Sequence, residues 1–319
     1  MKNQLNARLI NAMSDALPAK MNLANFLTKE LLLSREAAYR RLRGEVPFGL
    51  DETAQIAMKL NLSIDNIIGN HENSAAMIHM NLNKSKDAMV NYELTMERFL
   101  QISKMIKDMN PLTFSCATNL LPFVFCEPYE YINKFRISRR LHLSNKIKGT
   151  GSLADIEISE NTLKLQKIIA QNYRLIPNTI FIWDTNIILS FIKMIQLFYN
   201  LRILSKEDIK HLKNELHTLM YDAEEITNFG KYRDGGNVNI YLSNINLEAS
   251  YGYLESDNFC MSTFRVYAIN IIDSQHPDIC RLQKNWILSL RRYATLITES
   301  CETERLKFFN LQHEYIDSI

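Results

Sequence analysis

The chain has 319 residues, and its 37 Lys and Arg against 35 Asp and Glu give a formal net charge of only +2. This balance excludes a polybasic protein of the histone type and an acidic disordered chain, so any nucleic-acid partner must be sought in local charge. A hydrophobic fraction of 46% is typical of a globular protein. At about 100–200 residues per domain, the length predicts two domains or three small ones.

The content of glycine, proline and cysteine further limits the possible fold classes. Only 9 Gly and 7 Pro favour long helices over an all-β fold. The five cysteines are scattered without a CxxC pair, which predicts neither a disulfide framework nor a zinc ribbon. No signal-peptide pattern opens the chain, and the apolar stretch 180–201 is interrupted by polar residues. We therefore expect a cytoplasmic protein that does not enter a membrane.

The first seventy residues show the spacing of a compact bundle of short helices. Asn22 and Ser34 are suitable N-caps for the second and third helix, and Gly44 is a suitable stop for the third. The second and third helices are separated by a tight turn, which predicts helix-turn-helix geometry. The expected helices cover residues 5–17, 22–31, 34–43, 50–60 and 63–69.

The third helix is rich in arginine on its expected outer face. Four arginines and one acid between residues 35 and 43 give a local charge of +3. Arginine forks suit guanine edges and phosphates, and a tyrosine can contact a thymine methyl group. The alternative is an ordinary solvated surface, but the cap and the tight turn favour a recognition helix. Ala38 and Leu42 are expected to face inward, and Arg35, Glu36, Tyr39, Arg40 and Arg43 outward.

Residues 27–69 resemble the lambda-repressor-like, Cro/C1-type (Xre-like) helix-turn-helix regulators. The resemblance lies in the scaffold helix ending at Leu31, in Ser34 opening the next helix, and in Arg43-Gly44 closing it. It continues through a fourth helix that ends at Leu60 and the turn that follows. Two positions depart from the family pattern: Leu42 stands where the family often has Glu, and Arg41 where it usually has an apolar residue.

The resemblance implies a bacterial transcription regulator, typically a repressor, that binds double-stranded DNA as a homodimer. Carried over by position, it assigns contacts to base edges and contacts to the DNA backbone. The loop 45–49 joins the backbone contacts. The base contacts are Arg35, Glu36, Tyr39 and Arg40, and the backbone contacts are Thr28, Lys29, Ser34 and Arg43.

The remainder, residues 70–319, follows a polar linker at about 70–90 and carries no pattern that names a family. Residues 112–126 suit either a buried strand or a turn and helix, and residues 237–262 alternate like a small antiparallel sheet. The predicted fold class is therefore mainly α: a five-helix bundle over residues 1–69, then a helix-rich α+β region. Its expected helices cover residues 92–109, 129–143, 161–173, 184–201, 205–227, 264–272, 278–298 and 302–316.

Two segments of this region leave alternatives open. Residues 131–150 hold six Lys and Arg and no acid, which suits a contact to DNA phosphates or to an anionic ligand. We favour the plainer interpretation, a solvated helix end. The nearly all-apolar helix expected over 184–201 suits either a buried core or a subunit contact.

No nucleotide, zinc, hydrolase or calcium motif is present. We expect no enzyme, no catalytic residue, no cofactor and no metal. The sequence favours a DNA-binding transcriptional regulator whose region 70–319 dimerises and senses an effector, either a small molecule or a protein. The alternatives are a protein-interaction or antitoxin-like module that uses the bundle for assembly, and, more weakly, an enzyme carrying a DNA-targeting domain.

Overall fold

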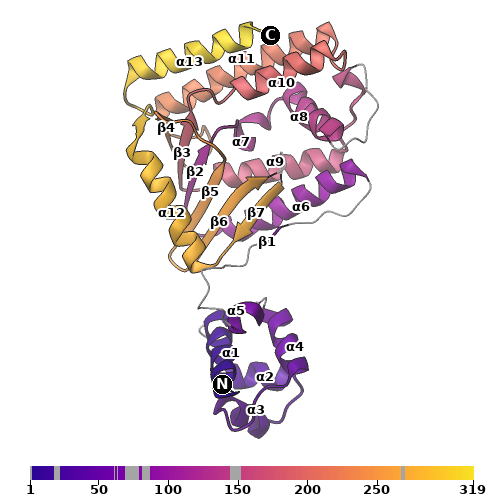
Figure 1. The fold of residues 1–319 in the computed structure, drawn as a ribbon, viewed down its shortest axis with the longest axis vertical. Helices are drawn as coiled ribbons and strands as arrows, with labels where there is room; N and C mark the ends of the chain where they lie inside the picture. Colours follow the sequence, from indigo (N-terminus) through magenta and orange to yellow (C-terminus); the bar gives the residue numbers. More distant parts are fainter. Residues whose placement is uncertain are drawn as a thin grey trace. The chain divides into compact units, whose positions relative to one another are not determined.

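A computed structural model describes residues 2–17, 22–60, 62, 64–68, 79–80, 87–143, 152–266 and 270–319. The chain divides into two compact units, residues 1–77 (unit 1) and 78–319 (unit 2). Each is described by itself (Figure 1). Most of the linker expected at 70–90 lies outside the described residues.

The described part of unit 1 consists of five helices. Asn22 begins the second helix, where its side chain accepts hydrogen bonds from the backbone N–H groups of Ala24 and Asn25. The core is formed by the apolar faces of all five helices, with Met13, Leu27 and Ile56 fully buried. The helices are α1 (Lys2–Ala16), α2 (Leu23–Glu30), α3 (Arg35–Leu42), α4 (Leu50–Leu60) and α5 (Ile64–Ile68).

Unit 2 is built on an eight-stranded sheet with the order β1-β7-β6-β5-β2-β3-β4-β8. The central strands β2, β3 and β4 are parallel, and the flanking pairs are antiparallel. Parallel neighbours need long crossovers, and helices supply them here. The strands are β1 (His79–Met80), β2 (Thr113–Thr118), β3 (Asn178–Asp184), β4 (Asn237–Ser243), β5 (Tyr251–Ser256), β6 (Phe259–Val266), β7 (Asn270–Ser274) and β8 (Ala294–Leu296).

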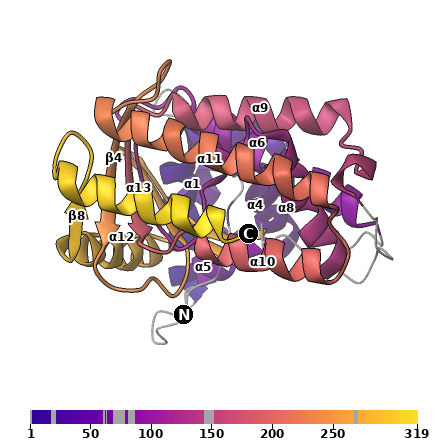
Figure 2. The same ribbon diagram turned by 90° about the horizontal axis from the view of Figure 1, so that it is seen from above.

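Helices cover both faces of this sheet (Figure 1). One face packs on α12, through Ala117, Ile182 and Tyr253. The opposite face packs on the remaining helices, and α13 lies along α10 and α11 (Figure 2). The helices are α6 (Ala88–Ile106), α7 (Phe123–Cys126), α8 (Glu130–Leu143), the short 3-10 turn at Leu153–Asp155, α9 (Glu160–Arg174), α10 (Leu189–Asn200), α11 (Lys206–Phe229), α12 (Pro277–Arg292) and α13 (Glu302–Asp317).

The predicted fold class is wrong for unit 2. A helix-rich α+β region with a small antiparallel sheet at 237–262 was predicted, but the sheet of unit 2 is mixed and has eight strands, from β1 to β8. The physical reason is clearest at β3, whose residues 181–184 are all buried. Its apolar run lacks the alternation that identifies a half-exposed strand.

The observed bounds of several elements in unit 2 differ from the predicted ones. The predicted helix 184–201 begins only at Leu189, because residues 178–184 form β3. The predicted helix 264–272 is wrong, since β6 and β7 occupy its described residues. The predicted helix 278–298 ends at Arg292 and is followed by β8. Residues 112–126 contain both alternatives, a strand and then a short helix.

Candidate functional site

The α2–α3 pair of unit 1 is joined by a turn of four residues. Leu31 caps α2 with a backbone N–H bond to the Leu27 carbonyl, and Ser34 caps α3. The Ser34 hydroxyl accepts a hydrogen bond from the Ala37 N–H at 3.2 Å. Between them, Leu32 has a left-handed backbone with φ of 53°. These caps and the turn fix the direction in which α3 leaves α2.

The outer face of α3 is as predicted. Ala38 is fully buried, and Leu42 packs at the edge of the same core. The four residues expected to reach bases are all exposed, namely Arg35, Glu36, Tyr39 and Arg40.

The residues expected to contact the DNA backbone differ in whether their polar groups already form hydrogen bonds within the protein. Lys29 is exposed near the end of α2 and pairs with no carboxylate in the described part of the chain. The Thr28 hydroxyl is half-buried and donates to the Asn25 carbonyl at 2.9 Å. The exposed Ser34 is already engaged as the N-cap, although its hydroxyl proton remains available.

Glu45, in the loop after α3, holds two of the exposed arginines. Its carboxylate lies 2.6 Å from Arg43 Nε and 3.5 Å from Arg40 Nε. The hydrogen bond from Arg43 outweighs the effect of desolvation and lowers the pKa of Glu45. The free protein therefore keeps Arg40 and Arg43 close together on one carboxylate, and a phosphate or a guanine edge must compete with it.

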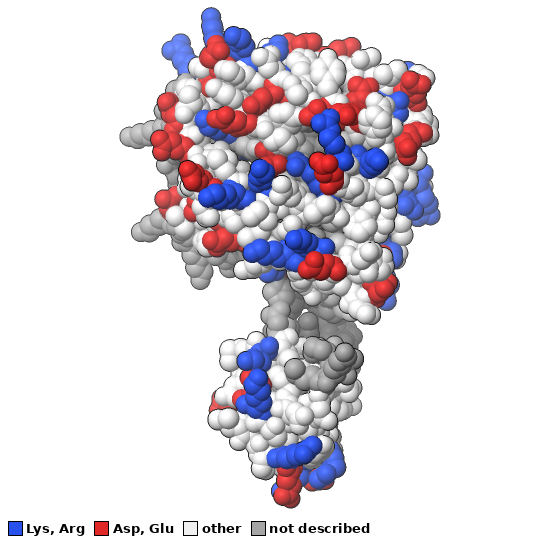
Figure 3. Space-filling model, turned by 180° about the vertical axis from the view of Figure 1, so that it is seen from behind, with Lys and Arg blue, Asp and Glu red and all other residues white. Residues whose placement is uncertain are grey.

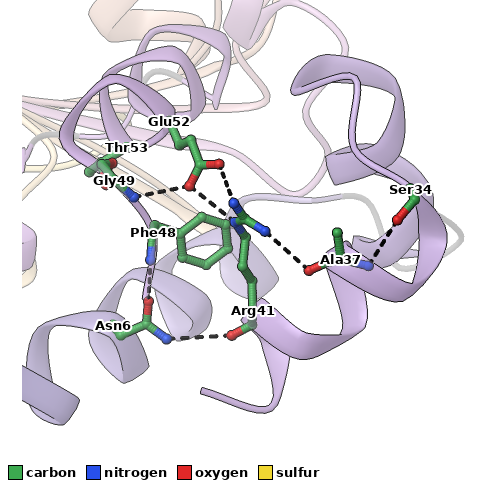
Figure 4. Close-up of polar contacts among 8 residues, drawn as sticks. All are labelled: Asn6, Ser34, Ala37, Arg41, Phe48, Gly49, Glu52 and Thr53. Carbon is green, nitrogen blue, oxygen red and sulfur yellow. Dashed lines mark hydrogen bonds and ion pairs between the residues drawn. The ribbon is translucent and has the colours of Figure 1, made fainter. Parts of the chain in front are cut away.

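Arg41 lies on the opposite side of α3 and is a residue whose role the sequence pattern does not reveal. Its guanidinium donates to Glu52 through Nη2 at 2.7 Å and through Nε at 3.1 Å (Figure 4). Both side chains are largely buried, at 17% and 23% exposed. This bidentate ion pair links α3 to the first turn of α4.

The same network extends to α1 and to the loop before α4. Asn6 donates to the Arg41 carbonyl at 3.4 Å and accepts from the Phe48 N–H at 3.1 Å (Figure 4). Glu52 also accepts from the Gly49 N–H at 3.0 Å. Arg41 stands at the position where the resembled family usually has an apolar residue, and here an ion pair supplies the packing contact between α3 and α4.

The exposed charge of this end of unit 1 is mixed. Basic and acidic side chains lie next to each other at the end that carries α3 (Figure 3). Arg41 does not belong to this surface, because its charge is balanced internally by Glu52. The exposed cations on and beside α3 are therefore Arg35, Arg40 and Arg43.

The second basic stretch of the sequence, 131–150, lies in α8 and the residues beyond it. Arg136, Arg139 and Arg140 are half-buried, so the interpretation as a solvated helix end is wrong for them. Lys146 and Lys148 lie outside the described residues.

The described residues form neither a metal-ligand cluster nor a membrane-spanning helix. Within the described ranges, no three His, Cys, Asp or Glu side chains are grouped to hold a metal ion. None of the helices described here combines the length and the apolar character needed to cross a bilayer.

Part of the chain matches a known protein family. Residues 3–99 are similar to the BetR domain family. This stretch takes in the described helices of unit 1 and most of α6. No curated protein and no solved structure matches the chain.

Proposed function

We propose that the protein is a sequence-specific, DNA-binding transcriptional regulator that acts as a homodimer. The observation that carries this proposal is the exposure of Arg35, Glu36, Tyr39 and Arg40 on one face of α3. The opposite face of α3 is held by the core and by Arg41. A helix presented in this way can enter the major groove, where arginine forks read guanine edges.

Lys29 is exposed near the end of α2, Arg43 is the C-cap of α3, and the Ser34 hydroxyl lies at the start of α3. Their positions suit contacts to phosphates on either side of the groove, which position a protein on DNA without reading its sequence. Two copies of unit 1 in a dimer would then read two half-sites about one helical turn apart.

The alternative function, assembly with a protein partner, was suggested by the apolar helix expected at 184–201. In the structure α10 buries Phe191, Ile192, Ile195 and Phe198 in the core of unit 2. That core explains the buried apolar residues of α10, whereas Leu197 and Tyr199 of the same helix are exposed.

Selection of randomised duplex DNA by the full-length protein at near-physiological salt tests the proposal. The expected result is an enriched pseudo-palindrome with half-sites about one turn apart. The control is a variant carrying Arg35→Ala, Tyr39→Ala and Arg40→Ala, which should enrich nothing. Equal enrichment by the variant, or only weak and strongly salt-dependent binding by both, would overturn sequence reading by α3.

A further inference from the structure

Unit 2 contains a cavity of about 190 Å³ between the sheet and the helices α6, α7, α8 and α9. Its floor is formed by alternate residues of the central strands, with Phe114 and Cys116 of β2 beside Phe181 of β3. At the same level on β5 stands Gly252, opposite Cys116. The absence of a side chain at Gly252 keeps the floor open, since a Cβ there would lie 2.4 Å from Thr263 Oγ1.

The walls of the cavity are mainly aromatic and aliphatic. Tyr92, Met96 and Phe99 of α6 line one side, and Phe123 of α7 lines another. A cavity of about 150 Å³ with aliphatic and aromatic walls is large enough for benzene. This one therefore accommodates a single ring or a short carbon chain.

Two hydroxyl groups of the cavity, those of Thr118 and Ser250, already lie within hydrogen-bond distance of protein partners. Thr118 and Ser250 lie 2.9 Å apart, and Thr118 also donates to the Leu120 carbonyl at 2.7 Å. Ser250 donates to Asn119 Oδ1 at 3.1 Å. The protons of these two hydroxyl groups are therefore not available to a ligand.

Positive charge gathers at the cavity. Arg136 of α8 and Arg265 of β6 both line it, and Arg136 also lies over the Phe123 ring, 5.5 Å from its centroid. Burial and then the charges of Arg136 and Arg139 lower the pKa of Arg265 to about 9. The arginines are thus close enough to repel one another, in surroundings that disfavour charge.

Arg136 and Arg139 of α8 both act on Arg265 through their charge. Among the residues that the structure describes, neither Arg136 nor Arg139 forms an ion pair with Asp or Glu. A partly buried arginine that has no carboxylate beside it, as Arg136 and Arg139 have none among the described residues, is favoured by an accompanying anion.

We propose that this cavity binds a small organic carboxylate, with its ring or short chain against the aromatic walls and its carboxylate at Arg136 and Arg265. The planar guanidinium fork matches a carboxylate in two parallel hydrogen bonds. The inference goes beyond the proposed function, because unit 2 alone forms the cavity and its ligand would bind whether or not unit 1 binds DNA.

The test is calorimetric titration of the full-length protein, without DNA, against benzoate, phenylacetate, hexanoate and octanoate. The matched neutral probes are the corresponding amides, which have the same shape without the charge. We expect at least one of these carboxylates to bind at least tenfold more tightly than its amide. Arg136→Gln should weaken that binding about tenfold or more, and Arg136→Lys should weaken it less, because it keeps the charge without the fork.

Arg233→Gln is the control variant, since Arg233 is exposed and pairs with Glu225 at 3.2 Å. It should bind the carboxylates like the wild type, and circular dichroism checks that each variant is folded. Equal binding of acid and amide would overturn the role of the arginines. Equal binding of inorganic phosphate would overturn the role of the apolar walls, and no binding of any carboxylate at millimolar concentration would overturn the site. None of these outcomes depends on DNA, so the proposed function fails or stands separately.

Discussion

Neighbouring arginines of α3 have opposite roles. Arg40 points outward beside Glu45 with 52% of its side chain exposed, whereas Arg41 points inward to Glu52 with 17% exposed. A helix turns by about 100° per residue, so consecutive residues face different directions. Charge counted along the sequence therefore overstates the positive surface of this helix, since one of its four arginines serves packing.

Arg40 should determine base preference, and Lys29 should not. We predict that Arg40→Ala weakens binding to the selected site by about 1–3 kcal/mol and relaxes one base position. Lys29→Ala should weaken binding to selected and random DNA alike and reduce the slope of affinity against salt by about one. Fluorescence anisotropy titrations at several salt concentrations measure both. Equal losses on selected and random DNA for Arg40→Ala would contradict base reading by this residue.

Arg41 should stabilise unit 1 without contacting DNA. Arg41→Ala leaves Glu52 partly buried with only the Gly49 N–H as a partner, which we expect to cost about 1.5–3 kcal/mol. Hydrogen exchange of residues 35–60 in the full-length protein measures this loss. Arg35→Ala, an exposed arginine of the same helix, is the control and should leave exchange unchanged.

The Arg41–Glu52 pair should make the stability of unit 1 depend on pH. Burial acts to raise the pKa of Glu52, but the hydrogen bonds from Arg41 and Gly49 outweigh it, and the net effect lowers this pKa. Since the folded pKa lies below the unfolded value, the stabilisation is present above the ordinary Glu pKa and is lost as pH falls through the folded pKa. In Arg41→Ala this acid-dependent loss of stability should be smaller, because the contact that lowers the pKa of Glu52 is gone. An acid profile of stability identical to that of the wild type would contradict the ion pair.

At the scale of elements, the turn between α2 and α3 stores strain at Leu32. Its φ of 53° is unfavourable for a residue with a Cβ, and its side chain is 90% exposed, so packing does not compensate. We predict that Leu32→Asn stabilises unit 1 by about 1 kcal/mol, because Asn tolerates this conformation. Leu32→Ala keeps the Cβ and should give no gain. Hydrogen exchange of α2 and α3 distinguishes the two variants, and equal effects would contradict the strain.

Elements were predictable from sequence where one side of them meets solvent. The caps Asn22 and Ser34 and the spacing of the five short helices locate the described elements of unit 1. In unit 2, the capping box of Ser205 and Asp208 likewise marks the start of α11. The run Ile180–Trp183 carried no such signal, because it is apolar at every position and its pairing partners lie far along the chain.

The candidate site, too, has a part that could be predicted from the sequence and a part that could not. The exposed face of α3 was predictable, because its residues are set by helical period alone. The Arg41–Glu52 pair and the cavity were not, because each depends on residues brought together by the fold. Arg136 and Arg265 are far apart in sequence and meet only across the helix and sheet layers of unit 2.

The packing of α11 against α13 includes a pair of histidines. His217 Nδ1 and His313 Nδ1 lie 2.7 Å apart with stacked rings, and Asp317 lies 3.2 Å from His217 Nε2. Desolvation, followed by the charge of His217, lowers the pKa of His313, although Asp317 acts in the opposite direction. The short contact between the two rings requires one nitrogen to donate and the other to accept, so it is lost when both rings are protonated.

Unit 2 should therefore lose stability in mild acid. Because the folded pKa of His313 lies below the unfolded value, stability is complete above that value and falls as pH drops through the folded pKa. We predict that His313→Gln reduces the slope of melting temperature against pH between about pH 5 and pH 7. The control is His211→Gln. His211 lies on α11, as His217 does, but its ring stacks on Tyr131, so this variant should keep the wild-type slope. An unchanged slope in His313→Gln would contradict the role of the pair.

At the scale of the whole molecule, the two units have separate cores. Each hydrophobic cluster among the described residues belongs entirely to unit 1 or entirely to unit 2. When two units have cores that share no residue, the unfolding of one does not remove core contacts from the other. We therefore expect unit 1 and unit 2 to unfold in separate transitions.

Tryptophan allows these transitions to be distinguished in the intact protein. Both tryptophans, Trp183 and Trp286, belong to unit 2, and Trp183 is fully buried. Its fluorescence therefore reports the unfolding of unit 2, whereas circular dichroism at 222 nm, a helix signal of peptide groups, reports both units. We predict that Arg41→Ala moves the part of the dichroism transition that belongs to unit 1 to lower urea concentration and leaves the fluorescence transition unchanged. A shift of both signals together would mean that the units unfold as one cooperative body, because a change in the core of unit 1 would then have reached the core around Trp183.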